Sequence, residues 1–244
     1  MKKLWLIFLI LMGAALLSPT ANAGLFCRLV KIENHQGSCY VDGYAPIQNT
    51  KTHKYGLAKK GNHIIIPAQY DNSAGIDNGL WAVELNSKWG MVTVNNDIII
   101  PFEYDKLNPP NQHGIIRANK NGQWGFIDKN QNELLVFGKY DYVEPFAFDG
   151  FAWVRKDDKW GFIDKDFNEI APPQYDTHNY FTRPIVCIKK NGKSGCINKQ
   201  GVEVVPFIYD KIDVYGSQTQ STVVAYLNDE VFYFDNLRIK KVVQ

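Results

Sequence analysis

The side chains that could catalyse a reaction or bind a metal are scattered along this chain. The histidines show neither the His-x-His nor the His-x-x-x-His spacing that is typical of metal ligands. They are His35, His53, His63, His113 and His178. No Gly-x-Ser-x-Gly elbow and no phosphate-binding glycine loop is present. The recurrent paired acids, Asp157-Asp158 and Asp164/Asp166, have the setting of turn residues. The sequence therefore predicts no catalytic residue, no metal site and no cofactor. A hydrolase whose residues come together from distant loops is the alternative.

The N-terminus has the pattern of a cleaved signal peptide. Lys2-Lys3 provide a positive start, residues 4–17 an apolar stretch, and Ala21-Asn22-Ala23 an A-x-A cleavage pattern. A membrane anchor is the alternative, but Ser18-Pro19-Thr20 end the apolar run short of the ~20 residues that a span needs. We therefore expect cleavage near Ala23, a periplasmic or secreted location, and no stable membrane insertion after cleavage.

The charge balance argues against nucleic acid as a partner. The full chain has 27 basic and 25 acidic residues, and removal of Lys2 and Lys3 leaves 25 of each. A neutral chain with mixed charges lacks the basic surface that binds nucleic acid or anionic lipid.

Export also favours pairing of the four cysteines. Asn191-Gly192 is the signal of a two-residue type I′ hairpin, and counting outward from it places Cys187 opposite Cys196. This is a non-hydrogen-bonded pair, whose Cα atoms lie about 4.5 Å apart, a separation that a disulfide tolerates. We predict a Cys187–Cys196 disulfide and, by elimination, a Cys27–Cys39 disulfide that ties down the N-terminal segment. Free buried thiols are the alternative.

A unit of about 35 residues recurs five times and must position all of these side chains. Its glycines are 34, 35, 36 and 34 residues apart: Gly56, Gly90, Gly125, Gly161 and Gly195. Such a period indicates one supersecondary unit stacked on copies of itself. Three copies have tryptophan before the glycine, at Trp89, Trp124 and Trp160, whereas Tyr55 and Ser194 stand there in the outer copies.

The second copy shows the elements that we expect in each unit. Residues 80–85, 88–94 and 97–104 have the β-branched and aromatic residues of strands, separated by Asn-containing turns. Each copy is thus predicted to be a three-stranded antiparallel meander. Segments 106–114 and 177–184 are predicted to be long connections to the next copy. The tryptophans are expected to bury a face between copies, and the aspartate after the last strand to cap the turn that leaves it.

These motifs resemble the bacterial WG-repeat (KWG-type) family. The match is clearest at Trp89-Gly90, Trp124-Gly125 and Trp160-Gly161, and it covers about residues 51–215. The third copy departs from the pattern, since it has Phe137-Gly138 in place of its proline. The resemblance implies a β-repeat scaffold that mediates interactions and has no known enzymatic activity, and it transfers no catalytic residue.

The predicted architecture is all-β. Residues 1–23 form the signal peptide, 24–50 an N-terminal cap or partial repeat, 51–215 five repeats, and 216–244 a C-terminal partial repeat. The two incomplete ends favour a propeller-like closure over an open β-solenoid.

The function expected from this sequence is a non-catalytic, exported module that binds a protein partner, as a scaffold, inhibitor or immunity-type partner. The inter-repeat loops are the expected binding regions, including 108–113. Their candidate binding residues are Phe146, Phe148, Phe151, His178, Tyr180, Phe181 and Arg183. For each of them, a place in the inter-repeat core is the alternative. Binding of carbohydrate or peptidoglycan (cell-wall glycan) through exposed aromatics is the alternative function, with Trp81 and Trp153 as its best candidates.

Overall fold

The computed structural model describes residues 29–181, 184–216, 221–235 and 238–242, and the regular elements within these ranges are all β-strands. The predicted signal peptide, Cys27 and Arg183 lie outside the described residues. None of the described segments forms a helix that is long and apolar enough to cross a membrane.

The strands form six antiparallel sheets in chain order. The first contains β1 (Leu29–Ile32), β2 (His35–Cys39), β3 (Tyr44–Asn49), β4 (Tyr55–Lys59) and β5 (His63–Tyr70). The second contains β6 (Asn72–Asp77), β7 (Leu80–Leu85), β8 (Lys88–Thr93) and β9 (Ile98–Tyr104). The third contains β10 (Lys106–Leu107), β11 (Ile116–Lys120), β12 (Gln123–Ile127) and β13 (Glu133–Leu135). The fourth contains β14 (Tyr142–Val143), β15 (Phe151–Lys156), β16 (Lys159–Asp164) and β17 (Glu169–Tyr175). The fifth contains β18 (Ile185–Lys190), β19 (Lys193–Asn198) and β20 (Glu203–Tyr209). The sixth contains β21 (Lys211–Gly216), β22 (Ser221–Leu227), β23 (Glu230–Asp235) and β24 (Arg238–Val242).

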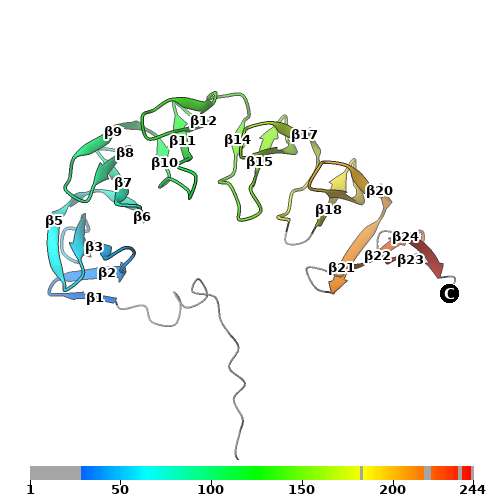
Figure 1. Ribbon diagram of the computed structural model, residues 1–244, viewed down its shortest axis with the longest axis horizontal. Coiled ribbons are helices and arrows are strands. Elements are labelled where there is room, and N and C mark those ends of the chain that lie inside the picture. The colour runs from blue at the N-terminus through cyan, green and yellow to red at the C-terminus, as the bar shows by residue number, and fades with distance from the viewer. Residues whose placement is uncertain (1–28, 182–183, 217–220, 236–237, 243–244) are drawn as a thin grey trace, which may run out of the picture.

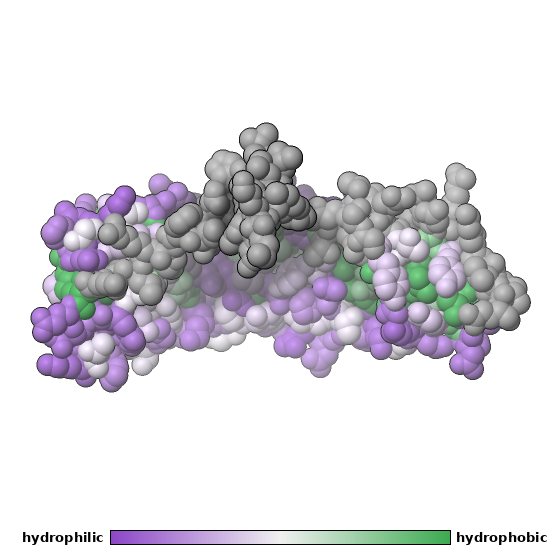
Figure 2. Space-filling model, turned by 90° about the horizontal axis from the view of Figure 1, so that it is seen from below, coloured by the Kyte–Doolittle hydropathy of each residue, from purple (hydrophilic) through white to green (hydrophobic). Residues whose placement is uncertain are grey.

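The six sheets follow one another along an arc, and the loops after β10, β14 and β17 descend on its concave side (Figure 1). The all-β tandem array is confirmed. Among the described strands, none of the first sheet pairs with one of the last, so the propeller-like closure stays a prediction. Figure 2 views the array from below Figure 1. Hydrophilic side chains cover much of this face, and hydrophobic ones show towards both ends.

The hydrophobic core lies between neighbouring sheets. One cluster joins Trp89 and Met91 of the second sheet to Leu107, Ile116 and Ile127 of the third. Equivalent clusters join the other successive pairs of sheets. The prediction that the repeat tryptophan packs between copies is confirmed at Trp89. Each sheet therefore depends on its neighbours for burial, as in other repeat architectures.

The predicted meander is present in every copy, but most sheets have a further strand before it. In the second copy β7, β8 and β9 match the predicted strands closely. The segment 106–114, predicted to be a connection, begins with β10, which pairs with β11. In the same way, β1 and β2 precede the meander of the first sheet, and β21 to β24 form a whole sixth sheet. The fifth sheet has three strands, because residues 177–181 form none.

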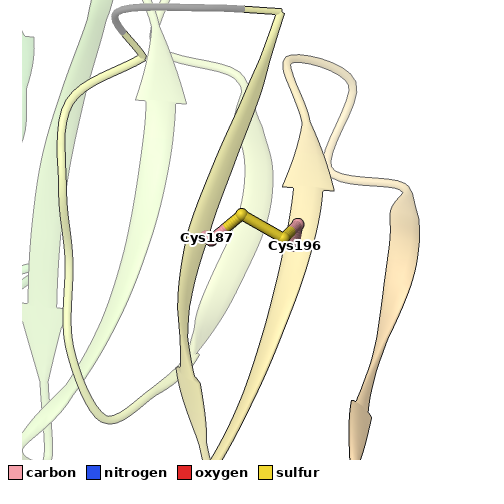
Figure 3. Close-up of a disulfide and its surroundings, with 2 residues drawn as sticks. All are labelled: Cys187 and Cys196. Atoms are coloured by element: carbon pink, nitrogen blue, oxygen red, sulfur yellow. A yellow bond between two sulfur atoms is a disulfide. The ribbon is translucent and has the colours of Figure 1, made fainter. Parts of the chain in front are cut away.

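The predicted Cys187–Cys196 disulfide is present. It links β18 to β19 across the hairpin (Figure 3), at the predicted register and with a Cα–Cα distance of 4.0 Å. Asn191 and Gly192 have φ values of 50° and 77°, as a type I′ turn requires. In the preceding sheet Trp153 stands opposite Phe162 at the same offset. The disulfide therefore replaces an aromatic cross-strand pair. Because Cys27 is not described, the second predicted disulfide stays a prediction.

The aspartate after the last strand of each copy clamps neighbouring sheets together. Asp105 accepts a hydrogen bond from Lys88 Nζ of its own copy at 2.6 Å and one from Gly122 N of the next sheet's turn at 2.9 Å. Its own N–H donates to Asn119 O of the next sheet at 2.8 Å. The lysine, aspartate and turn recur together around Asp71, Asp176 and Asp210. The expectation of a cap on the local turn is therefore wrong, since the carboxylate caps the following hairpin.

The clamps predict loss of stability in acid. A hydrogen bond from the clamp lysine is the main cause that lowers the pKa of Asp71, Asp105 and Asp210. For Asp176, the hydrogen bond from Gly192 N lowers the pKa most, and the hydrogen bond from Lys159 comes second. A carboxylate whose pKa is lower in the folded chain contributes stability that is complete above its unfolded pKa, about 3.9. That contribution is lost as the pH falls through the folded pKa. We expect the urea midpoint to fall steeply below about pH 4, and Asp105→Asn to flatten this fall. The same flattening in Asp42→Asn, which alters an exposed turn residue outside the clamps, would contradict this explanation.

Candidate functional site

Two loops that the sequence singled out meet on the concave side of the arc. One joins β14 to β15 (residues 144–150), and the other follows β17 (residues 177–181). Phe181 N donates to Asp149 Oδ2 at 3.0 Å, and Tyr180 OH donates to Glu144 Oε2 at 2.7 Å. The other carboxylate oxygen of Glu144 lies 3.2 Å from His178 Nε2. We call residues 144–151 and 177–181 together the loop surface.

Three of the predicted binding residues form the base of the loop surface. Phe181 is buried, with its ring centroid 5.3 Å from that of Phe162 and 5.4 Å from that of Phe151. Phe146 is half-buried against Phe126 at 5.1 Å. For Phe146, Phe151 and Phe181, the alternative of a place in the inter-repeat core is the correct one.

Phe148 and Tyr180 are the exposed aromatics of the loop surface. Phe148 is fully exposed and Tyr180 is 48% exposed. His178 lies behind them, stacked on Trp160 with ring centroids 3.9 Å apart. The hydrogen bond to Glu144, followed by partial burial, raises the pKa of Tyr180, so its phenol stays protonated and keeps donating to Glu144. Tyr180 is therefore held in place by Glu144.

A row of packed arginine and aromatic side chains beside the loop surface was not predicted from the sequence. Arg117 Cζ lies 3.6 Å from the centroid of the Trp124 ring, and Arg117 Nε donates to Val143 O of the next sheet at 2.6 Å. The ring of Tyr142 meets two tryptophans edge-on, with its centroid 5.5 Å from that of Trp124 and 6.2 Å from that of Trp160. Burial lowers the pKa of Arg117. The row joins the third and fourth sheets and ends at His178.

The tryptophans proposed for glycan binding do not form a platform. Trp81 and Trp153 are 0% and 1% exposed. Their selection as the best glycan candidates is wrong, because the first strand of the meander lies inside the array and both of its faces are covered.

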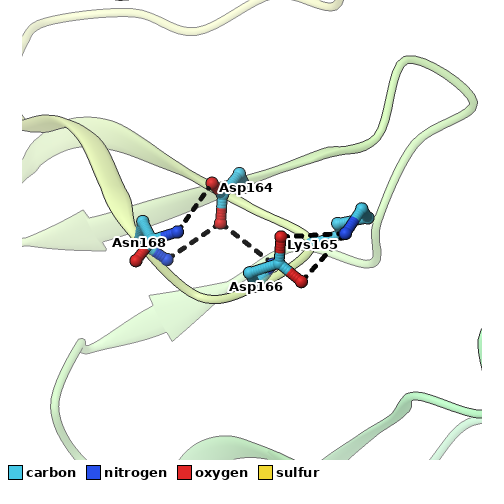
Figure 4. Close-up of polar contacts among 4 residues, drawn as sticks. All are labelled: Asp164, Lys165, Asp166 and Asn168. Atoms are coloured by element: carbon cyan, nitrogen blue, oxygen red, sulfur yellow. Dashed lines mark hydrogen bonds and ion pairs between the residues drawn. The ribbon is translucent and has the colours of Figure 1, made fainter.

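The paired acids near Asp164 serve the turn between β16 and β17 (Figure 4). Asp164 Oδ1 accepts hydrogen bonds from the N–H groups of Asp166 and Asn168, each at 2.9 Å. Desolvation raises the pKa of Asp164, but the hydrogen bonds that its carboxylate accepts outweigh this effect and lower the pKa. The strongest of them comes from the Asn168 side chain. Lys165 pairs with Asp166 at 2.8 Å. Across the described ranges, no three His, Cys, Asp or Glu side chains gather in a way that could hold a metal ion.

The spacing of the repeat glycines agrees with that of a known repeat family. The model of the WG containing repeat matches residues 55–89, 89–124, 124–160, 160–193 and 195–217. The chain belongs to the WG-repeat family. Four of the five WG-repeat matches begin at the residue before the repeat glycine, and the last begins at the glycine itself. The matches therefore follow the period seen in the sequence. No curated protein matches the chain in sequence.

Solved structures resemble the WG-repeat array only distantly. KlHsv2 with its loop 6CD replaced by a Gly-Ser linker is 8% identical, with a TM-score of 0.46 and coverage of 84% of this chain and 80% of that one. The computationally designed Ika8 protein is 11% identical, with a TM-score of 0.41 and coverage of 88% and 86%. These likenesses carry no argument about closure or function.

Proposed function

We propose that this WG-repeat protein is an exported, non-catalytic interaction module that binds another protein through the loop surface. Export is supported by the signal-peptide pattern of residues 1–23. The observation that carries the proposal is the full exposure of Phe148 on a loop whose other aromatics are packed.

The loop surface has the anatomy of a binding hot spot. Exposed aromatic side chains supply most of the binding energy in many interfaces, provided that they are presented from a rigid base. Here Phe148 and Tyr180 project from loops that Phe181 and the Asp149 hydrogen bond tie together. Tyr180 also has a phenolic hydroxyl, which donates a hydrogen bond to Glu144 in the free protein.

Replacement of either exposed aromatic is expected to weaken partner capture without unfolding the array. We expect Phe148→Ala or Tyr180→Ala to weaken binding by about 2 kcal/mol, roughly 30-fold, which is typical of a hot-spot residue. The measurement is crosslinking and capture from the periplasm and medium with the tagged mature chain, followed by titration of the partner identified. Thermal unfolding should be unchanged within about 0.5 kcal/mol, because neither side chain is buried.

Val136→Ala is the matched control, since Val136 is 62% exposed but directly follows β13 of the third sheet, outside the loop surface. Equal capture by the Phe148→Ala variant and the unaltered chain would contradict the proposal. An equal loss of partner capture in the Val136→Ala and Phe148→Ala variants would also contradict it. Recovery of cell-wall material without a protein partner would favour the glycan alternative.

A further inference from the structure

Cavities open between neighbouring sheets at both copies in which the repeat tryptophan is replaced. One, of about 260 Å³, lies between the fifth and sixth sheets, with Ser194, Lys189, Lys211 and Ile212 in its lining. The other, of about 400 Å³, lies between the first and second sheets beside Tyr55. The two cavities thus coincide with the two departures from the family pattern.

The cavity at Ser194 occupies the place that an indole ring fills in the second copy. Ser194 pairs with Lys189 and Tyr209 as Trp89 pairs with Glu84 and Tyr104. Trp89 packs in one cluster with Leu107, and Lys106 Nζ lies 5.6 Å from the centroid of its ring. Lys211 and Ile212 are the counterparts of Lys106 and Leu107, because each pair directly follows the clamp aspartate. The surroundings of an indole are therefore kept, while the indole itself is replaced by serine.

The lining of this cavity suits an aromatic ring. Ile188, Ile212 and the Cys187 end of the disulfide supply apolar surface. Ser194 is 7% exposed and lies at the floor, whereas Lys189 and Lys211 are exposed at the rim. An ammonium group near a ring adds a cation–π attraction, as Lys106 does for Trp89. A cavity of about 150 Å³ already takes benzene, so this larger one has room for an indole or phenol ring.

We propose that the cavity at Ser194 is a receptor pocket for an aromatic side chain of a bound polypeptide. The proposal rests on the protein-binding function above and adds to it the residue class that the partner presents. The disulfide between β18 and β19 crosslinks two strands of the wall and so limits its collapse. The partner's ring then takes the place between two sheets that Trp89 fills in the second copy.

The first test is an NMR titration of the mature chain with N-acetyl-L-tryptophanamide. We expect amide shifts at Ser194, Lys189 and Ile212, together with intermolecular NOEs from the indole ring to the methyl groups of Ile188 and Ile212. N-acetyl-L-leucinamide should give neither. The absence of these NOEs in the unaltered chain would overturn the proposal without recourse to any variant. Tighter binding of indole-3-acetate than of the amide would assign the pocket to a free aromatic acid and overturn it as well.

Ser194→Trp restores the family residue and should fill the pocket. We expect this variant to lose at least tenfold in affinity for the probe and to gain a few degrees in Tm, because buried apolar area increases. Ser194→Ala keeps the cavity and should bind the probe as the unaltered chain does. In the capture assay, Ser194→Trp should weaken partner binding while Ser194→Ala leaves it unchanged. If Ser194→Trp still captured the partner fully while Phe148→Ala did not, the pocket proposal would be wrong. The proposed function would then still hold.

Discussion

Gly161→Ala is expected to lower the free energy of unfolding by about 4 kcal/mol or more, a loss that few single substitutions produce. A Cβ at this position would lie 2.4 Å from Ala171 O and 2.7 Å from Pro172 C and Pro173 N. All three atoms belong to the backbone of the facing strand, so no side-chain movement can relieve the overlap. β17 bulges over the glycine, since Trp160 pairs with Tyr175 but Phe162 already pairs with Ala171. The measurement is urea unfolding followed by tryptophan fluorescence.

Gly122→Ala is the control for this prediction. Gly122 has nothing within 4 Å of the added Cβ, but its φ is +75°. The left-handed conformation costs an alanine about 1–2 kcal/mol. If Gly161→Ala loses no more stability than Gly122→Ala, the close approach does not explain why glycine recurs after the repeat tryptophan.

The period and the turn chemistry of the sequence were enough to predict the meanders and the disulfide hairpin. Both depend on local signals. Alternation and Asn-containing turns define β7, β8 and β9, and a two-residue turn fixes the register that brings Cys187 opposite Cys196. The same register brings Trp153 opposite Phe162 in the preceding sheet.

The fourth strand and the clamps could not be predicted in this way. β10 has two residues, too few to show alternation, and it exists because the preceding clamp brings its backbone beside β11. Asp105 reaches a turn 17 residues further along the chain. An aspartate in a loop usually bonds nearby amides, and only the stacking of the sheets makes the distant turn the closer partner.

The loop surface was predictable as a region but not residue by residue. Aromatic enrichment marked both loops, yet Phe146 and Phe148 differ completely in exposure although they are two positions apart. Their burial depends on the path of the loop, which no local pattern specifies. Glu144 was missed, because a single acid in a loop carries no signal until His178 and Tyr180 are brought to its two oxygens.

Trp153→Ala is expected to lower the free energy of unfolding by about 3–5 kcal/mol, the usual range for a large aromatic removed from a core. Trp153 is 1% exposed, and its ring centroid lies 5.2 Å from that of Phe162 and 6.3 Å from that of Phe181. Removal of the indole therefore opens a cavity between the fourth and fifth sheets and takes support from Phe181. Urea unfolding gives the loss of stability. Hydrogen exchange should show faster opening at residues 177–181 than in the first and second sheets, since packing in a repeat array is local.

Phe148→Ala is the matched control for this loss, because it removes another aromatic side chain from the same region, but one that is fully exposed. Its stability should stay within about 0.5 kcal/mol of the unaltered chain. The two variants then separate two effects on partner capture. Phe148→Ala should lose capture while the array remains as stable as before. Trp153→Ala should lose both together, because Phe181 positions the loop that carries Tyr180. Equal stability of the two variants would show that Trp153 contributes little to the core, and would contradict this prediction.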